Sequence, residues 1–299
     1  METKRIAGVQ LTPKNIQTVR LVLALLESDY EIHLEDSFTS IMDYLQNYFT
    51  LDFRIGLGES SILQNVFIDH QIPLCKVNEI AKPLIFPSCI IERCRAKWHQ
   101  VRENEFFLSG LITKDREKTL LNWIFQNSDQ PIIKLKYQFR KILFINQFVT
   151  QFSKIKKKGI SSQISISLNK KNKLILVPST KGRYFPEKSW DEEYFDQLSR
   201  SKFVLCPNGD FVWTYRFFEA ILCGAIPIIQ EETELYDGFF FYKFSDPFSE
   251  IIYSDEVVER NFEFARNFLT IRKEKLNYEI GKMIGLEQCK FSSNSLEST

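Results

Sequence analysis

The chain has 299 residues, of which 44% are hydrophobic and 26% are charged, the balance of a soluble globular protein. This length is enough for two domains of about 100–150 residues each. The net charge of +1 argues against nucleic acid as a partner, because proteins that bind nucleic acid usually carry a strongly basic surface.

Cysteine spacing and hydropathy exclude further classes of protein. The six cysteines include no C-x-x-C pair and the three histidines are scattered, which excludes a zinc-finger type of protein. The N-terminus is polar and shows no signal peptide, and no apolar run approaches the roughly 20 residues of a membrane helix. We therefore expect a cytoplasmic protein with reduced thiols.

Residues 1–100 are expected to form a first α/β domain. The glycine-containing turn at residues 56–60 could face a ligand, but it lacks a complete phosphate-binding motif, and most such turns only connect two elements. Apolar periodicity predicts strands at residues 5–10, 51–55 and 74–77, and helices at residues 15–28, 39–48, 61–68 and 89–98.

The second domain is expected at residues 101–285, after a polar linker. Its first elements are a strand at residues 105–108, a turn at Ser109 and Gly110, and a helix at residues 114–125. Gly110 would let the backbone approach a ligand, and Arg116 lies near the helix N-terminus, where anions bind. The alternative is an ordinary tight turn beside a solvated arginine, because charged runs are usually exposed.

A lysine-rich segment comes next in the second domain. A helix is predicted at residues 134–148, and residues 153–173 are expected to form a flexible connection or a hairpin. The lysine run at residues 154–158 is most simply a solvated surface. A peripheral contact with a membrane or an acidic acceptor is the less favoured alternative.

A clear apolar strand at residues 174–177 leads into a loop that contains Lys181 and Arg183. Hydroxyls, a glycine and two cations in one loop suit phosphate binding, provided that this strand and the strand before Pro207 end at the same edge of the sheet. The alternative is an ordinary polar loop, and the sequence does not choose between the two.

Residues 201–230 contain the most informative pattern in the chain. A strand, a loop, a helix and a second strand follow one another, which predicts a βαβ unit with parallel strands. Its parts are a strand at 203–206, a loop with Pro207, Asn208, Gly209 and Asp210, the N-cap Thr214, a helix at 215–222, the helix stop Gly224 and a strand at 225–229.

Two charged residues, Arg216 and Glu219, interrupt this apolar unit. They are three positions apart, so they share one face of the helix, close to its N-terminus. Ligands of α/β sheets bind outside the carboxyl ends of the strands, and a helix N-terminus there favours anions. Arginine adds a planar donor group suited to phosphate, and the glutamate could accept hydrogen bonds from ribose hydroxyls. The alternative is a weak surface ion pair.

The motif resembles the exostosin-type glycosyltransferases. That family has a strand, a Pro-x-Gly loop, a Ser/Thr-x-Arg-x-x-Glu-Ala helix start, a small residue and a Pro-containing strand. The match runs over about residues 194–230, a minor part of the chain, and a looser similarity covers Gly110 and Arg116. The matching residues are Pro207, Gly209, Thr214, Arg216, Glu219, Ala220, Gly224 and Pro227.

The resemblance implies a fold and an activity. The fold is α/β with two Rossmann-like domains facing a cleft (the GT-B type), and a C-terminal helix, here at residues 254–280, crosses back to the first domain. The activity is transfer of a sugar from a nucleoside-diphosphate sugar, most simply a UDP-sugar, to a hydroxyl of a glycan or another acceptor, with inversion. Enzymes of this architecture commonly work without a metal, so we expect no prosthetic group and no essential metal. Residues 286–299 would be a polar tail.

The resemblance also assigns roles around the diphosphate. Arg216 would stabilise the negative charge that develops on the leaving group, and Glu219 would hold the ribose. In the loop that carries Asn208, Gly209 would let the backbone approach the donor, and Thr214 would cap the helix or touch phosphate.

An inverting transfer normally needs a general base for the acceptor hydroxyl. The base should come from the first domain or an interdomain loop, and Glu59, Asp69 and His70 are candidates by residue type. Each of them, taken alone, is more simply a solvated surface group. A carboxylate of the acidic loop at residues 231–234 could contact donor hydroxyls, although such a cluster mostly indicates solvent.

Two other functions stay open. One is a fucosyltransferase-like enzyme with a guanosine donor, whose motif also places a glutamate in a helix before a Gly-x-x-Pro strand. The spacing from Pro207 to Arg216 favours the exostosin-like interpretation. The other is a non-catalytic nucleotide-binding scaffold of the same fold, which would keep Arg216 and Glu219 but lack a base.

Overall fold

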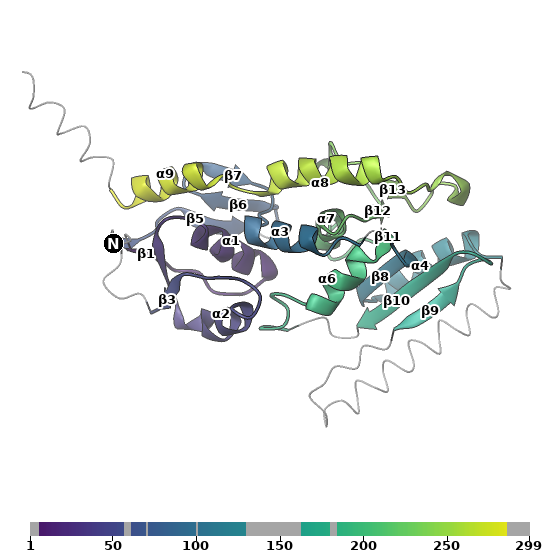
Figure 1. The fold of residues 1–299 in the computed structure, drawn as a ribbon, viewed down its shortest axis with the longest axis horizontal. Coiled ribbons are helices and arrows are strands. Elements are labelled where there is room, and N and C mark those ends of the chain that lie inside the picture. The colour runs from purple at the N-terminus through teal and green to yellow at the C-terminus, as the bar shows by residue number, and fades with distance from the viewer. Residues whose placement is uncertain are drawn as a thin grey trace, which may run out of the picture. The chain divides into compact units, whose positions relative to one another are not determined.

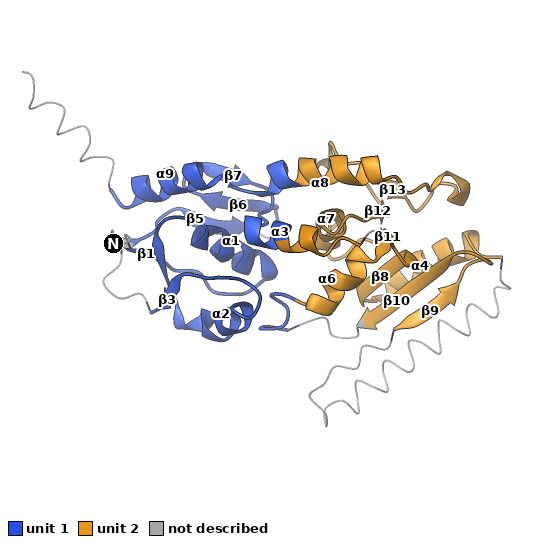
Figure 2. Cartoon of the chain, in the orientation of Figure 1, with its two compact units in different colours: residues 1–92, 184–190, 266–299 blue, residues 93–183, 191–265 orange. Residues whose placement is uncertain are grey.

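The computed structural model describes residues 6–56, 61–69, 71–99, 101–129, 163–179 and 184–285. The chain forms two compact units, each assembled from separate stretches of sequence (Figure 2). It leaves the first unit inside α3 (Ser88–Ala96), a few residues before the predicted linker. It returns to that unit for residues 184–190 and again at the end of α8 (Asp255–Leu269). Unit 1 contains residues 1–92, 184–190 and 266–299, and unit 2 contains residues 93–183 and 191–265.

Unit 1 is built on a parallel sheet with the strand order β3-β2-β1-β4. This is the strand order of the first half of a Rossmann fold, with helices α1 and α2 as the first two connections. α1 is the helix predicted at residues 15–28, and the side chain of its N-cap, Asn15, accepts a hydrogen bond from the Thr18 N–H. The elements are β1 (Ile6–Val9), α1 (Ile16–Leu26), β2 (Glu31–Leu34), α2 (Thr39–Leu45), β3 (Phe53–Ile55) and β4 (Ser61–Ile62).

The helix predicted at residues 61–68 is wrong. Residues 61 and 62 form β4, which pairs with β1, and β5 (Val66–Asp69) pairs with β6 (Leu74–Val77) in a separate antiparallel sheet that ends with β7 (Ile80–Lys82). Asn65, between β4 and β5, has a φ of +59°, a left-handed conformation that an α-helix cannot contain. Whether a short apolar run forms a strand or a helix depends on which distant segment it pairs with. The periodicity of the run itself does not identify that segment.

The long helix predicted at residues 254–280 is two helices, α8 and α9 (Lys273–Met283), both of them amphipathic as expected. α8 ends where unit 1 supplies donors for its last carbonyl groups. The Lys82 Nζ lies 2.7 Å from the Phe268 carbonyl oxygen, and the Phe86 N–H donates to the Leu269 carbonyl at 3.0 Å. These bonds satisfy groups that would otherwise need another helical turn.

Unit 2 contains a six-stranded sheet with the order β13-β12-β11-β8-β10-β9 (Figure 1). All neighbours are parallel except β9, which pairs antiparallel with β10 at one edge. The parallel strands therefore follow the flavodoxin-like order 2-1-3-4-5. The elements are β8 (Asn104–Leu111), α4 (Lys114–Gln126), β9 (Ile164–Ser167), β10 (Lys173–Ser179), α6 (Glu192–Ser199), β11 (Ser201–Cys206), α7 (Tyr215–Leu222), β12 (Ile226–Ile229) and β13 (Tyr242–Lys243).

The core of unit 2 follows from the two-residue period of its strands. Phe106 in β8 is level with Phe203 in β11, and their rings stack at 5.3 Å on the face of the sheet that α4 covers with Trp123. The alternate strand residues point to the opposite face, where α6 and α7 contact β11. A helix on each face is what a doubly wound sheet requires, and both strands of the predicted βαβ unit are buried along their whole length, apart from partly exposed Lys202.

Both units are thus α/β with parallel sheets in Rossmann-like strand orders, which confirms the α/β class and the two Rossmann-like units of the predicted fold. No helix among the residues described is both long and apolar enough to cross a membrane. The helix predicted at 134–148, the lysine run at 154–158 and the tail at 286–299 lie outside the described residues.

Candidate functional site

The strand order of unit 2 places a switch point between β8 and β11. From β8 the chain passes through α4 to β10 on one side, whereas β11 lies on the other side of β8. The loops that leave two adjacent strands at such a point diverge, and α/β proteins bind their ligands in the resulting crevice. The predicted residues Gly110 and Gly209 lie at the carboxyl ends of these two strands.

Arg116 extends from the first turn of α4 to the loop after β11. Thr113 caps this helix by accepting a hydrogen bond from the Arg116 N–H. The side chain then donates from Nε to the Asn208 carbonyl at 2.7 Å and from Nη1 to the Leu111 carbonyl at 2.8 Å. Its remaining nitrogen, Nη2, lies 2.5 Å from the position that a Cβ on Gly209 would occupy. Glycine at 209 therefore makes room for this arginine.

Arg216 is the counterpart of Arg116 on the neighbouring helix. Thr214 is the N-cap of α7, as predicted, and its hydroxyl accepts from the Arg216 N–H at 3.4 Å. The Arg216 Nη2 lies where a Cβ on Gly110 would be, and Gly110 has a φ of +138°, which favours glycine. Each arginine thus crosses the glycine of the other strand.

The two guanidinium groups form no ion pair within hydrogen-bond distance among the residues described. Burial lowers the pKa of Arg116, the positive charge of Arg216 lowers it further, and Asp210 acts in the opposite direction. Arg216 Nε and Nη1 are buried and have no hydrogen-bond partner in the described part of the chain. Buried donors without acceptors are costly, and two like charges side by side add to the cost. An anion between them would relieve both.

Glu219 is buried rather than paired at the surface. Its exposed fraction is 3%, and its Oε2 accepts a hydrogen bond from the Tyr194 hydroxyl of α6 at 2.7 Å. The alternative of a surface ion pair with Arg216 is therefore wrong. The carboxylate lies one helical turn beyond Arg216, and its contact with ribose stays a prediction.

Asn208 connects the two strand ends. Besides accepting from Arg116 through its carbonyl, it donates from Nδ2 to Glu231 Oε1 at 2.8 Å, and its N–H donates to Gln230 Oε1 at 3.3 Å. Gln230 and Glu231 follow β12, so Asn208 fixes the loops after β11 and β12 to each other.

Several other predicted residues can be placed only in part. Lys181 and Arg183 lie outside the described residues, but β10 is parallel to β8 and β8 to β11, so the three strands end at the same edge as their phosphate role requires. Glu59 and His70 also lie outside the described residues. Asp69 ends β5 in unit 1, where its Oδ1 accepts from the N–H groups of Gln71 and Ile72 as in an ordinary turn.

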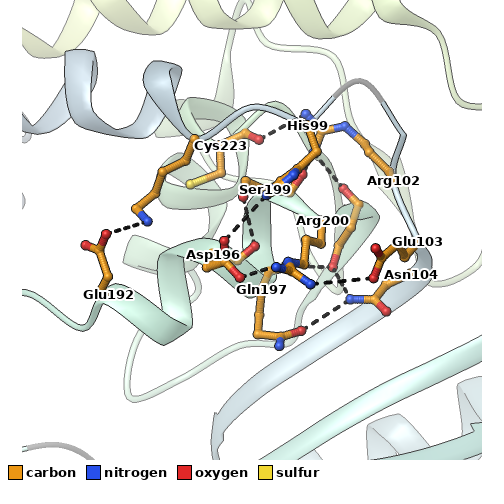
Figure 3. Close-up of polar contacts among 12 residues, drawn as sticks. His99, Arg102, Glu103, Asn104, Glu192, Asp196, Gln197, Ser199, Arg200 and Cys223 are labelled. Atoms are coloured by element: carbon orange, nitrogen blue, oxygen red, sulfur yellow. Dashed lines mark hydrogen bonds and ion pairs between the residues drawn. The ribbon is translucent and has the colours of Figure 1, made fainter.

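The opposite edge of the same sheet holds a structural network (Figure 3). Arg102, just before β8, donates from Nη1 to the carbonyls of Ser199 at 2.6 Å and Ser201 at 3.0 Å, and from Nη2 to that of Cys223 at 3.1 Å. It thereby caps the C-terminal ends of both α6 and α7. Both of its terminal nitrogens donate to backbone carbonyls, whereas Nε and Nη1 of Arg216, at the carboxyl edge, have no partner among the residues described.

Two tyrosines that support the site were not predicted. Tyr194 holds Glu219, and the Tyr236 hydroxyl accepts from the Thr214 N–H at 2.9 Å, at the N-terminus of the helix that carries Arg216. Burial raises the pKa of Tyr236 well above its ordinary value, so its hydroxyl stays neutral. Both contacts join residues more than 20 positions apart, and no local pattern marks them.

Comparisons with known proteins bear on part of this chain. Residues 129–258 match the family model of the Exostosin GT47 domain. A search of curated proteins found no match. Among solved structures, sucrose-phosphate synthase from Thermosynechococcus elongatus is matched with a TM-score of 0.33 and 12% identity, over 94% of this chain and 63% of that chain.

The matched segment contains Asn208, Gly209, Thr214, Arg216 and Glu219, whereas Gly110 and Arg116 precede it and are joined to it by the contacts described above. Residues 129–258 are therefore similar to the exostosin family, to which the motif pointed.

Proposed function

We propose that this protein is a glycosyltransferase that moves a sugar from a nucleoside-diphosphate sugar, most simply a UDP-sugar, to a hydroxyl group of a glycan or another acceptor. The observation that carries the proposal is the pair of arginines at the switch point of unit 2, each crossing a glycine of the neighbouring strand. The family match supports the same class of reaction.

The diphosphate of the donor would lie between the two arginines. Arg216 offers Nε and Nη1, which have no partner among the described residues, and both arginines belong to the first turn of their helices, whose N-termini favour anions. When the bond between the anomeric carbon and the phosphate oxygen breaks, negative charge grows on that oxygen. Fixed cations stabilise this charge without reorganisation, so no metal ion is needed for it.

The new glycosidic bond forms between the acceptor and the sugar. Its hydroxyl oxygen attacks the anomeric carbon from the side opposite the phosphate, which inverts the configuration, and its proton passes to a general base. The diphosphate leaves with the electron pair of the broken bond. We keep Glu59, Asp69 and His70 as candidates for the base, and Glu219 as the group that accepts from the ribose hydroxyls.

The donor site is tested by ligand-dependent stabilisation. UDP and GDP, at equal concentrations, are added to the wild type and to Arg216→Ala, and the melting temperatures are measured. A ligand that binds only the folded state raises the melting temperature, and at equal ligand concentration the rise grows with the logarithm of the affinity. We expect one nucleotide to stabilise the wild type and to lose about tenfold or more of its affinity in the variant, because charge-assisted hydrogen bonds are lost.

Arg260→Ala is the matched control, since this exposed arginine of α8 lies outside the site. It should bind the nucleotide like the wild type. Folded wild type that responds to neither nucleotide would refute the donor site, and a response to GDP alone would favour the fucosyltransferase-like alternative. Slow hydrolysis, without acceptor, of a sugar nucleotide that carries the stabilising nucleotide would show that the protein is an enzyme and not a non-catalytic scaffold.

A further inference from the structure

Three carboxylates follow β12, and their surroundings differ. Glu232 forms an ion pair with Lys243 of the edge strand β13. Glu234 begins a short 3₁₀ turn (Glu234–Tyr236). Glu231 makes no ion pair in the described part of the chain and is instead held by two side-chain amides. In the sequence these residues form one acidic loop, whereas in the structure each of them has different contacts.

The amides fix one oxygen of Glu231. Its Oε1 accepts from Asn208 Nδ2 at 2.8 Å and from Gln230 Nε2 at 3.3 Å, while Gln230 Oε1 accepts from the Asn208 N–H at 3.3 Å. Three residues from two loops thus form a closed ring of hydrogen bonds. The second oxygen, Oε2, has no partner among the residues described, and the side chain is exposed. An exposed glutamate that is oriented by neutral amides presents a free acceptor in a defined direction.

The position of this acceptor is unfavourable for a diphosphate. Asn208 joins Glu231 to the arginine pair, because its carbonyl oxygen accepts from Arg116 Nε at 2.7 Å. A carboxylate next to an anion site repels the anion. If the site held only a nucleoside diphosphate, Glu231 would weaken binding. It contributes favourably only if the ligand also carries hydrogen-bond donors, and hydroxyl groups are the donors that a sugar offers.

We propose that Glu231 Oε2 accepts hydrogen bonds from hydroxyl groups of the sugar that is transferred, and that Glu231 thereby distinguishes the sugar nucleotide from the bare nucleoside diphosphate. This inference rests on the proposed function. It assigns the role to Glu231 and not to Glu232 or Glu234. Asn208 and Gln230 act as positioning residues for the carboxylate.

The test uses Glu231→Gln, which keeps the acceptor Oε1 for Asn208 and replaces the free acceptor Oε2 by an NH₂ donor. Affinities are measured by calorimetry for UDP and GDP, and for UDP-glucose, UDP-galactose, UDP-N-acetylglucosamine and GDP-mannose. Glu232→Gln is the matched control, because it removes the same charge from the adjacent residue.

We expect Glu231→Gln to bind the bare nucleotide as tightly as the wild type or more tightly, since a negative charge is removed. We expect its affinity for the best sugar nucleotide to fall about tenfold or more, the usual effect of losing hydrogen bonds to a charged acceptor. Glu232→Gln should bind both ligands like the wild type.

The failure of each proposal gives a different result. A wild type that binds no nucleotide refutes the proposed function and this inference with it. If the nucleotide binds and Arg216→Ala abolishes binding, the donor site stands. In that case, an unchanged preference of Glu231→Gln for the sugar nucleotide, or an equal loss in Glu232→Gln, would overturn the role of Glu231 alone.

Discussion

At the scale of single residues, the site depends on two glycines that leave space for two arginines. A Cβ on Gly110 or Gly209 would occupy the place of a guanidinium nitrogen. The two positions differ in their backbone, because Gly110 has a φ of +138° and Gly209 is not among the glycines with positive φ. Alanine substitution at the two positions should therefore distinguish an effect on ligand binding from an effect on stability.

We expect Gly209→Ala to weaken nucleotide binding about tenfold with little effect on stability, because the methyl group displaces only the end of Arg116. Gly110→Ala should weaken binding as well and also cost about 1–3 kcal/mol of unfolding free energy, owing to its backbone conformation. Nucleotide titration and urea unfolding of both variants measure the two effects. Equal destabilisation by the two substitutions would contradict the backbone argument.

The buried contact between Tyr194 and Glu219 is a second feature at this scale. Tyr194→Phe removes the hydroxyl that donates to Glu219 and keeps the packing of the ring. Because a buried acceptor loses its donor, we expect a loss of about 1–3 kcal/mol in urea unfolding. Tyr278→Phe, at an exposed tyrosine of α9, is the control and should change stability little. A Tyr194→Phe variant as stable as the wild type would show that the bond contributes nothing.

At the scale of elements, helix α7 of unit 2 is fixed at both ends by residues from elsewhere in the chain. α7 begins at Thr214, whose N–H donates to the Tyr236 hydroxyl, and ends where Arg102 donates to the Cys223 carbonyl. Arg102 also lies beside the Gly224 backbone and stacks 5.7 Å from the centre of the Trp98 ring. A single half-buried arginine thus stabilises the ends of two helices.

Replacing Arg102 by Lys tests this capping role. Lysine keeps the charge but cannot reach three carbonyls with a planar set of donors. We expect a loss of about 1.5–3 kcal/mol, the value for hydrogen bonds to a charged group, measured by urea unfolding. Arg95→Lys is an exposed comparison, because Arg95 pairs with Glu259 at the surface, and it should cost at most about 1 kcal/mol. Equal losses would contradict the capping role.

At the scale of the whole molecule, unit 1 is assembled from three separate stretches of chain. Trp190, from the middle stretch, is 1% exposed, and its carbonyl accepts from the Tyr44 hydroxyl at 2.8 Å. Near the C-terminus, the buried Glu279 accepts from Asn78 Nδ2 at 2.6 Å. Because distant segments complete one core, unit 1 should not fold from its first 92 residues alone.

The stability of the whole protein should depend on the ionisation of Glu27. Burial raises the pKa of this carboxyl group, although it accepts a hydrogen bond from the Cys89 N–H at 2.7 Å, at the start of α3. The unfolded chain therefore releases the Glu27 proton at lower pH than the folded protein does. The resulting contribution is fully favourable below the unfolded pKa, about 4.3, and is lost as pH rises through the folded pKa.

Glu27→Gln removes this dependence while it keeps an acceptor for Cys89. We expect the variant to gain stability relative to the wild type as pH rises from 4 to 7, in urea unfolding at each pH. Glu79→Gln, at an exposed position, should show a constant difference over the same range. A constant difference for Glu27→Gln as well would contradict the burial argument.

Sequence alone determined the elements whose signals are local. The N-cap at Thr214 needs only a hydroxyl and the N–H groups of the next turn, and the helix period then placed Arg216 and Glu219 on one face. The same reasoning found α1, predicted at residues 15–28, and the buried strands on both sides of α7. These features depend on residues a few positions apart, so periodicity and capping chemistry report them directly.

Only the tertiary structure decided which of these elements meet. Arg116 and Asn208 are 92 positions apart, and they are in contact because β8 and β11 are neighbours in the sheet. The same cause made residues 61–62 and 66–69 strands and brought Glu231 into contact with Asn208. Contacts of this kind depend on the order of the strands in the sheet. That order results from the packing of the whole unit, and hydrophobic periodicity in the sequence does not predict it.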